Sequence, residues 1–258
     1  MHRGGSDPAR LPLVPKVRPP LPEGTEKVYQ DYYLRNRLGA SASGWLSRAM
    51  ESWLHRRVAA DVTDDPSPKA TLEIGAGTLN QLPFEPEVGP YDIVEPVAEL
   101  YEGAALLRRV RRAYRDIHEV PRDARYDRIT SVATLEHVCN LPEVLATSAF
   151  LLTAGGTFRA GIPSEGTPLW RLGWRLTTGL EFRLRHGLDY ARLMRHEHVN
   201  TAREIEDLLR FFFRRIEMRV FGPARRLSFY QFFACADPDL GRSEAYLARL
   251  PQSGRPAP

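Results

Sequence analysis

Hydrophobic positions along the chain repeat with two different periods, and each period predicts a different kind of element. Between residues 25 and 62 apolar side chains recur at helical spacing, which predicts two helices ahead of the first strand. From residue 70 onward, short apolar runs alternate with helical stretches, a pattern typical of a doubly wound, mostly parallel α/β sheet. The predicted strands are 70–74, 91–94, 113–117, 125–132 and 156–162, with helices at 97–109 and 141–152.

The alternation is interrupted after the fifth predicted strand. Residues 164–200 are longer than an ordinary connection, and their leucines at helical spacing predict a helical insertion that covers a ligand pocket. Thr201 and Glu204 then form the pattern of a capping box, which predicts the start of an amphipathic helix. Two strands separated by a Gly-Pro step and a terminal helix are predicted to close the domain, at 214–221, 227–236 and 240–250.

These patterns divide the chain into one domain with two tails. Residues 1–24 are rich in Pro and Arg and lack periodicity, which predicts a flexible tail, and 251–258 are expected to form a second one. The domain spans 25–250. Within it we expect lid helices, a cofactor-binding core, the helical insertion, and a closing helix with its strands, at 25–62, 70–163, 164–200 and 201–250.

Composition narrows the class of protein. The 258 residues are 43% hydrophobic, enough for one sizeable core, and carry a formal net charge of +4 from many arginines. That charge favours an anionic partner, although a solvated arginine-rich surface explains it equally well. Cys139 and Cys235 have neither metal-ligand nor disulfide spacing. No apolar run has the length of a signal peptide or a membrane span, so we expect a cytoplasmic protein.

The stretch that carries the chemistry is the turn after the first strand. Gly75 and Gly77, spaced by one residue, allow the backbone to turn sharply and approach a ligand closely. A dinucleotide-binding turn has a third glycine where this chain has Asn80. Glu95 ends the following predicted strand roughly 20 residues beyond the glycines, where a carboxylate accepts from both hydroxyls of a ribose.

Glu73 with Gly75 and Gly77, followed by Glu95, resembles the first motifs of the class I S-adenosylmethionine-dependent methyltransferases. The resemblance runs from about residue 72 to 236 and includes the Leu-Glu-His stretch after the fourth strand. It implies a Rossmann-like, seven-stranded, mostly parallel sheet and S-adenosyl-L-methionine as the cofactor. The implied cofactor-binding residues are Glu73, Gly75, Ala76, Gly77, Glu95, Pro96, Asp116, Ile117 and Ala133.

Two departures from that family concern the cofactor pocket. Leu79 stands where a further glycine is common, which makes the loop bulkier. The step Asp116-Ile117 is followed by His118 and Glu119, so the adenine end of the pocket is expected to be more polar than usual. Tyr32, on the first predicted helix, either closes the methionyl end of the pocket or packs in the core.

Three histidines are candidates for a base that deprotonates an acceptor, because the pKa of an imidazole lies near neutrality. His137 follows the fourth predicted strand, and His196 and His198 lie where the insertion returns to the core. Structural hydrogen bonding is the alternative for each of them. The pair His196-x-His198 lacks an evident third ligand, so the sequence predicts no metal site.

The insertion is rich in arginine and contains Trp170 and Trp174. These residues could bind a phosphate or contact a membrane peripherally through 168–195. A solvated helical face is the alternative.

The leading hypothesis is methyl transfer to a small or medium metabolite. Several segments resemble bacterial methyltransferases of surface-polysaccharide or glycolipid assembly, which favours a hydroxyl of a sugar or of a lipid-linked sugar as the acceptor. The oligomeric state stays open.

Two other classes compete with this hypothesis. A nicotinamide-dependent oxidoreductase is disfavoured by Asn80, and because every lysine precedes the glycine turn. A non-catalytic protein of the same fold that binds nucleic acid through its basic surface lacks a recognition helix or aromatic-basic motif. Methylation of a base amine is disfavoured too, because Ser131-Val-Ala-Thr134 replaces the family's Pro-Pro-aromatic motif for such substrates.

Overall fold

The computed structural model describes residues 11, 14–21, 23–25, 28, 45–176 and 178–251. The predictions for Tyr32, for residues 26–44, and for most of the two tails lie outside this part of the chain. The described helices are α2 (Trp45–Thr63), α3 (Leu141–Leu151), α4 (Pro168–Leu176), α5 (Thr178–His186), α6 (Tyr190–Glu197), α7 (Ala202–Phe212) and α8 (Leu240–Leu247). The strands are β1 (Thr71–Ile74), β2 (Tyr91–Val94), β3 (Arg112–Tyr114), β4 (Tyr126–Val132), β5 (Leu152–Pro163), β6 (Phe213–Phe221) and β7 (Tyr230–Pro238).

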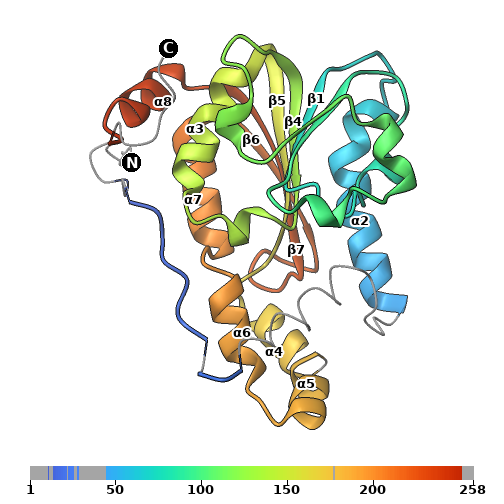
Figure 1. Cartoon of the computed structure of the whole chain (residues 1–258), viewed down its shortest axis with the longest axis vertical. Coiled ribbons are helices and arrows are strands. Elements are labelled where there is room, and N and C mark those ends of the chain that lie inside the picture. Colours follow the sequence, from blue (N-terminus) through green and yellow to red (C-terminus); the bar gives the residue numbers. More distant parts are fainter. Residues whose placement is uncertain are drawn as a thin grey trace.

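The strands form one seven-stranded sheet in the order β3-β2-β1-β4-β5-β7-β6 (Figure 1). The neighbours from β3 to β5 pair in parallel, and β7 runs antiparallel to both β5 and β6. The predicted seven-stranded, mostly parallel, doubly wound sheet is therefore confirmed. The strand order reverses between β1 and β4, and in folds of this kind ligands bind at the carboxyl edge beside such a reversal.

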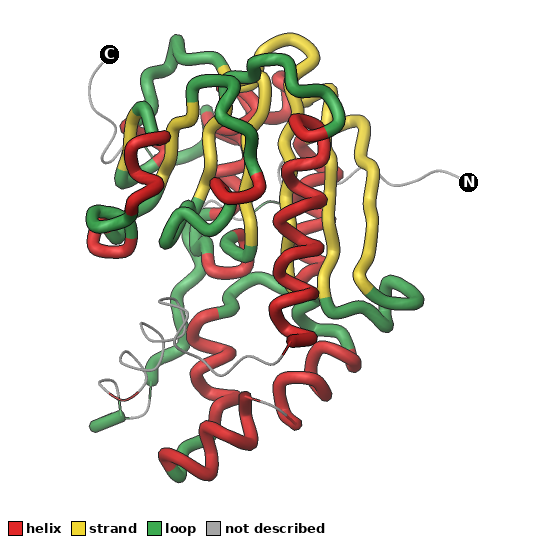
Figure 2. The backbone as a smooth tube through the Cα atoms, turned by 90° about the vertical axis from the view of Figure 1, so that its right-hand side faces the viewer, coloured by secondary structure: helices red, strands yellow, loops and turns green. Residues whose placement is uncertain are grey.

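Helices cover both faces of the sheet: Figure 1 shows α3 and α7 on one side of the strands and α2 on the other, and Figure 2 looks onto the side of α2. Alternate residues of a strand point to opposite faces, so Leu72 and Ile74 join the main apolar core with α3 and α7. The opposite face lies under α2. The predicted capping box of α7 is confirmed: the Thr201 hydroxyl accepts from the Glu204 N–H, and the Glu204 carboxylate accepts from the Thr201 N–H.

The predicted helix at 97–109 is wrong. This connection between β2 and β3 contains two short 3-10 turns, Ala98–Leu100 and Ala105–Arg109, which are separated by Gly103. Glycine in a helix interior costs roughly 1 kcal/mol relative to alanine, and neither turn has a side-chain cap. The apolar residues that suggested a helix pack into a small separate cluster on Tyr91 and Ile93.

The helical insertion lies between β5 and α7. Its helices α4, α5 and α6 group together at the carboxyl edge of the sheet, below the strands in Figure 1. Phe182 of α5 and Leu193 of α6 are buried in a small core of their own. The insertion thus returns the chain to the sheet at His198, next to the loop that leaves β4.

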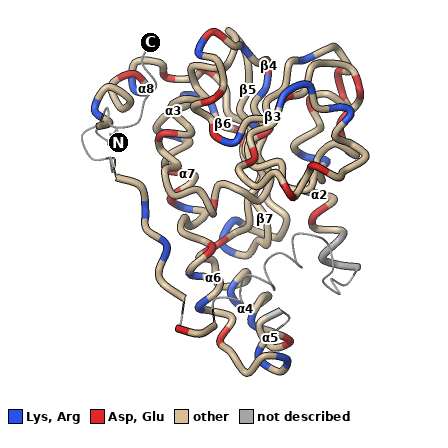
Figure 3. The backbone as a smooth tube through the Cα atoms, in the orientation of Figure 1, with Lys and Arg blue, Asp and Glu red and all other residues tan. Residues whose placement is uncertain are grey.

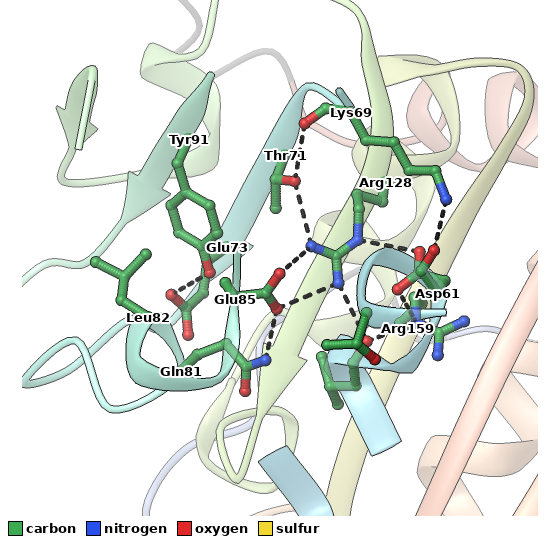
Figure 4. Close-up of polar contacts among 12 residues, drawn as sticks. Asp61, Lys69, Thr71, Glu73, Gln81, Leu82, Glu85, Tyr91, Arg128 and Arg159 are labelled. Atoms are coloured by element: carbon green, nitrogen blue, oxygen red, sulfur yellow. Dashed lines mark hydrogen bonds and ion pairs between the residues drawn. The ribbon is translucent and has the colours of Figure 1, made fainter. Parts of the chain in front are cut away.

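A buried network of charged side chains joins α2 to the sheet (Figure 4). Arg128 of β4 is 1% exposed, and its guanidinium donates to the Glu85 carboxylate at 2.7 Å and to the Asp61 carboxylate at 3.1 Å. The same guanidinium donates to the carbonyl of Val58 at 3.1 Å. Breaking a buried pair of this kind by removing one partner typically costs about 3–5 kcal/mol, because the other charge stays buried.

Arg159 of β5 repeats the arrangement one strand away. Its guanidinium donates to the carbonyls of Val58 and Arg57 at 2.7 and 2.8 Å and pairs with Asp61 at 3.1 Å. Arginine suits this position because its fixed fork of N–H groups donates to several acceptors at once. Two arginines on neighbouring strands therefore hold the last turns of α2 against the sheet.

Glu73 lies beside this network rather than on the open side of the glycine turn. Its carboxyl is 2% exposed and accepts a hydrogen bond from the Tyr91 hydroxyl at 2.8 Å. Burial, reinforced by the nearby carboxylate of Glu85, raises the pKa of Glu73 to about 8. The side chain is therefore mostly protonated at neutral pH.

Glu73 makes the stability of the fold depend on pH. The folded state holds the proton up to about pH 8, whereas the unfolded chain releases it near 4.5, so stability falls as pH rises through that interval. At about 1.4 kcal/mol per pKa unit the loss amounts to several kcal/mol. We expect Glu73→Gln to remove most of this loss, measured as chemical unfolding between pH 5 and 9. Exposed Glu102→Gln is the control, and parallel pH curves for Glu73→Gln and wild type would contradict the assignment.

Candidate active site

The loops after β1 and β4 are packed against each other where the strand order reverses. Gly75 has φ +73°, and a Cβ there would come within 2.1 Å of the Thr134 side chain. The Thr134 hydroxyl donates to the Gly75 carbonyl at 3.2 Å. Only glycine fits here, because its backbone is left-handed and the neighbouring loop occupies the space of a side chain.

Glu95 follows β2 and holds the glycine turn directly. One carboxylate oxygen accepts from the Gly77 N–H at 2.8 Å, and the other accepts from the Val97 N–H at 3.1 Å. Glu95 is 3% exposed, and Pro96 beside it is exposed. The structure thus brings together the glycines and the acidic strand end that the sequence analysis singled out.

The remaining predicted cofactor-binding residues differ in how far their side chains are exposed. The Asp116 side chain is 57% exposed and caps a short 3-10 turn by accepting from the His118 N–H. Ile117 is 3% exposed and belongs to the main core, so little of its side chain faces solvent. Ala133 is exposed at the end of β4 with φ +48°.

Next to the turn, Ala76 and Leu79 point into the small cluster that also contains Tyr91. Leu79 has φ +63° and is fully buried. In the family that the sequence resembles, a glycine is common at this position. The left-handed backbone explains that preference, because a non-glycine residue in this region is strained by roughly 1–2 kcal/mol. The loop retains the conformation typical of glycine while its leucine fills the core below.

Two of the three candidate histidines meet at the carboxyl edge. His137 lies in the 3-10 turn Leu135–His137 after β4, and its ring packs edge-on against that of His198, with ring centroids 4.8 Å apart. The preceding residue, Glu136, is 2% exposed, and its carboxylate approaches His137 Nε2 at 3.8 Å. Ligand atoms of these three side chains all lie within 4.8 Å of one another.

His196 does not join them. Its Nδ1 lies 2.7 Å from the carbonyl of Pro19, in the N-terminal segment 14–21 that runs along α6 and α7. Arg18 of that segment donates to the carbonyls of His137 and His196, both at 3.0 Å. The structure therefore gives His196 a role in holding this segment.

Glu165 is a functional candidate that the sequence analysis did not assign. Its carboxylate lies 2.8 Å from His198 Nδ1 and accepts from the indole N–H of Trp170 at 2.7 Å. Burial opposes its ionisation, but these hydrogen bonds outweigh burial and hold the pKa of the Glu165 carboxyl below its ordinary value. Its place directly after β5, at the same edge as Glu95 and His137, was the signal that could have identified it.

Tyr230, at the start of β7, lies against Trp170, with ring centroids 5.7 Å apart. Burial and the carboxylates of Glu51 and Glu136 raise the pKa of Tyr230 well above its ordinary value. Aromatic rings, carboxylates and imidazoles thus share one edge of the sheet.

A separate apolar cavity of ≈ 230 Å³ lies on the helical face of the protein, between α3, α7 and α8. Lys16 and Leu11 of the N-terminal part line one side of it, and Phe211 and Tyr246 line the other. None of its lining residues comes from the glycine turn or from the end of β2. We therefore place the active site at the carboxyl edge, where the titratable groups converge.

The comparisons with known proteins agree with this geometry. A family model described as methyltransferase domain matches residues 43–211. A fold of this class, with an acidic strand end beside a glycine turn, defines a class I S-adenosylmethionine-dependent methyltransferase. The chain belongs to this methyltransferase family, and S-adenosylmethionine is its cofactor. The family assignment decides against the nicotinamide-dependent oxidoreductase. No curated protein matches the sequence significantly.

Solved structures share the fold at low sequence identity. The 1,6-didemethyltoxoflavin N1-methyltransferase of Burkholderia thailandensis, with bound S-adenosylhomocysteine, is 20% identical with a TM-score of 0.56, covering 87% of this chain and 94% of that chain. The N-methyltransferase NodS of Bradyrhizobium japonicum is 13% identical with a TM-score of 0.55, and the match covers 83% of this chain and 100% of that chain. The magnesium protoporphyrin IX methyltransferase of Synechocystis is 13% identical with a TM-score of 0.53, and the match covers 82% of this chain and 99% of that chain. At these identities the likeness establishes the fold alone.

The residues present fit the cofactor. Each oxygen of the Glu95 carboxylate accepts one backbone N–H and retains a lone pair, so the group can still accept from two vicinal ribose hydroxyls. Asp116 presents an exposed carboxylate for an exocyclic amine.

Glu95 is the residue whose loss tests this site. Hydrogen bonds to a charged group contribute about 1.5–3 kcal/mol, so we expect Glu95→Ala to weaken S-adenosylmethionine binding by roughly tenfold to a hundredfold in calorimetric titration. Glu99→Ala, on the same loop but exposed, serves as the matched control. Equal affinities for the two variants, both folded by circular dichroism, would contradict a ribose-binding role.

Proposed function

We propose that the enzyme transfers the methyl group to a hydroxyl of a small or medium acceptor, most consistently a sugar or a glycolipid-type molecule. The observation that carries this proposal is the cluster of Glu136, His137 and His198 at the carboxyl edge. A hydroxyl must lose its proton as it is methylated, whereas a neutral amine can attack first. A cluster of imidazoles and a carboxylate suits the hydroxyl.

The bound cofactor would supply an electrophilic methyl group on a sulfonium. The chain's own residues would hold the ribose through Glu95 and align the acceptor oxygen with the methyl carbon. The histidine cluster would receive the proton that the acceptor hydroxyl loses. As the oxygen–carbon bond forms, the carbon–sulfur bond breaks and its electron pair goes to sulfur. The hydroxyl proton leaves through the cluster to solvent.

The aromatic side chains beside the cluster support a sugar acceptor. Trp170 and Tyr230 pack edge to face, and Glu165 accepts from the Trp170 indole. An aromatic ring with a polar handle offers an apolar face together with hydrogen bonds, which matches the two sides of a sugar ring. The helical insertion places these groups at the mouth of the site and is proposed to form its lid.

The histidine cluster gives this proposal its test. We expect His198→Ala to lower the rate of methyl transfer to hydroxyl acceptors by roughly 10²–10⁴-fold while leaving cofactor affinity unchanged. His196→Ala, a histidine two residues away that binds Pro19 instead, should retain activity within about twofold. The assay uses radiolabelled S-adenosylmethionine with nucleotide sugars, monosaccharides, glycolipids and matched amino sugars. Transfer to the amines alone would contradict the hydroxyl proposal.

We further propose that α4 and α5 bring the enzyme to an anionic membrane surface. None of the helices within the described residues is long and apolar enough to cross a membrane. The insertion instead exposes leucines at four-residue spacing, accompanied by exposed arginines on the same helices (Figure 3). These leucines are Leu172, Leu176, Leu180 and Leu184, which are 50–79% exposed. Apolar and basic side chains together are typical of helices that lie in a membrane interface.

Vesicle binding tests the membrane proposal. The protein is expected to co-sediment with vesicles of phosphatidylglycerol, to bind phosphatidylcholine vesicles much more weakly, and to be released by salt. The double variant Leu176→Glu with Leu180→Glu should lose most of the binding. Leu240→Glu, at a leucine 47% exposed on α8, should not change it. Equal binding by the double variant and wild type would refute the assignment of the surface to α4 and α5.

A further inference from the structure

We propose that Glu136, His137 and His198 form a site for a divalent transition-metal cation. One carboxylate and two imidazoles come from two segments far apart in the sequence, and their ligand atoms all lie within 4.8 Å of one another. Glu136 is 2% exposed, and the histidine side chains are 15% and 13% exposed. Small inward rotations would bring three such atoms to the distances of about 2.0–2.2 Å that metal ions require.

The outer contacts of the two histidines match those of metal ligands. His137 Nδ1 lies 2.9 Å from the carbonyl of Glu197, and His198 Nδ1 lies 2.8 Å from the carboxylate of Glu165. Each of these acceptors favours the tautomer that carries its proton on Nδ1. Both rings then carry their lone pair on Nε2, the orientation that carboxylate or carbonyl partners impose on metal-binding imidazoles.

Backbone hydrogen bonds fix the two segments relative to each other. The N–H groups of Val199 and Asn200 donate to the Glu136 carbonyl at 2.9 and 3.1 Å. The Asn200 side chain, itself 2% exposed, donates to the carbonyls of Leu135 and Val138 at 2.8 and 2.7 Å. The residues that carry the ligands are therefore held before any ion arrives, so little conformational entropy is lost on binding.

The donor set indicates the class of ion. Two imidazoles and one carboxylate suit Zn²⁺, Mn²⁺, Fe²⁺ or Co²⁺, whereas Mg²⁺ and Ca²⁺ prefer oxygen ligands throughout. Three protein ligands leave at least one coordination position open, which is the arrangement of a catalytic site rather than a structural one. An acceptor oxygen can occupy that position.

The role of the ion rests on the proposed function. With the ion bound, His137 and His198 serve as its ligands and do not accept the hydroxyl proton, which passes directly to solvent. A hydroxyl coordinated to the cation loses its proton to solvent near neutral pH more readily than a free one, because the positive charge stabilises the alkoxide. The alkoxide oxygen then forms the bond to the methyl carbon, while the carbon–sulfur bond breaks and sulfur keeps the electron pair. A sugar diol suits such a site well, because its two neighbouring oxygens can occupy two open positions.

Direct binding of Co²⁺ tests the site without any acceptor. The protein, prepared without a polyhistidine tag and treated with chelator, is titrated with Co²⁺ and followed by calorimetry and visible absorption. We expect one equivalent to bind with the absorption bands of a nitrogen- and oxygen-ligated ion. His137→Ala and His198→Ala should each abolish binding, and Glu165→Gln should weaken it by about 10–100-fold.

His196→Ala and His118→Ala are the matched controls, because these histidines contact Pro19 and Glu143 instead. Both should bind Co²⁺ as wild type does. Retained binding of S-adenosylmethionine shows that each variant is folded. Failure of wild type to bind Co²⁺, or binding that survives in His198→Ala, would overturn the metal site.

The two proposals can fail separately. If Co²⁺ binds through these residues but methyl groups go only to amines, the metal site stands and the hydroxyl proposal fails. If hydroxyl methylation continues at the same rate after chelator removes every equivalent of metal, the proposed function stands and the catalytic role of the ion is overturned.

Discussion

The buried contact between Arg128 and Glu85 is the constraint on which this fold depends. Arg128 lies in the middle of the sheet, 1% exposed, and its guanidinium reaches Asp61 and the Val58 carbonyl of α2 as well as Glu85. An arginine that is so buried is tolerated only when its donors are satisfied. The hydrogen bonds that satisfy these donors hold α2, the loop after β1 and the central strands together.

That arrangement has a consequence at the other end of the strands. Once α2 and the loop after β1 are fixed, the glycine turn contacts Thr134, which follows β4 on one side of β1, and Glu95, which follows β2 on the other side. The Glu95 carboxylate binds Gly77 on one side and Val97 on the other, so it links the two loops that would hold the cofactor. Charge buried under one face of the sheet thus supports the candidate site at its carboxyl edge.

The proposed acceptor side of the site is built differently, from segments that meet only in the folded protein. His137 follows β4, Glu165 follows β5, and His198 ends the helical insertion. Asn200 joins the first and last of these segments through hydrogen bonds to backbone carbonyls. The insertion therefore ends in a histidine that lies beside the loop after β4.

Local patterns were enough to predict the sheet, the glycine turn, the acidic strand ends and the capped helix α7, because each depends on neighbouring residues. The sequence did not reveal that Arg128 and Arg159 are buried, since charged residues in a strand usually face solvent. Glu165 and Glu136 were missed because His198, which lies close to both of them, is far away in the chain. The prediction of a helix at 97–109 was wrong because it relied on the apolar spacing and gave too little weight to Gly103, which is unfavourable inside a helix.

The most direct test of this account is the anomalous scattering of crystals grown with S-adenosylhomocysteine and Co²⁺, measured at the cobalt absorption edge. The account predicts one peak within coordination distance of Glu136, His137 and His198, facing the sulfur of a cofactor whose ribose lies on Glu95. A cofactor bound there with no cobalt peak beside these three residues would contradict it.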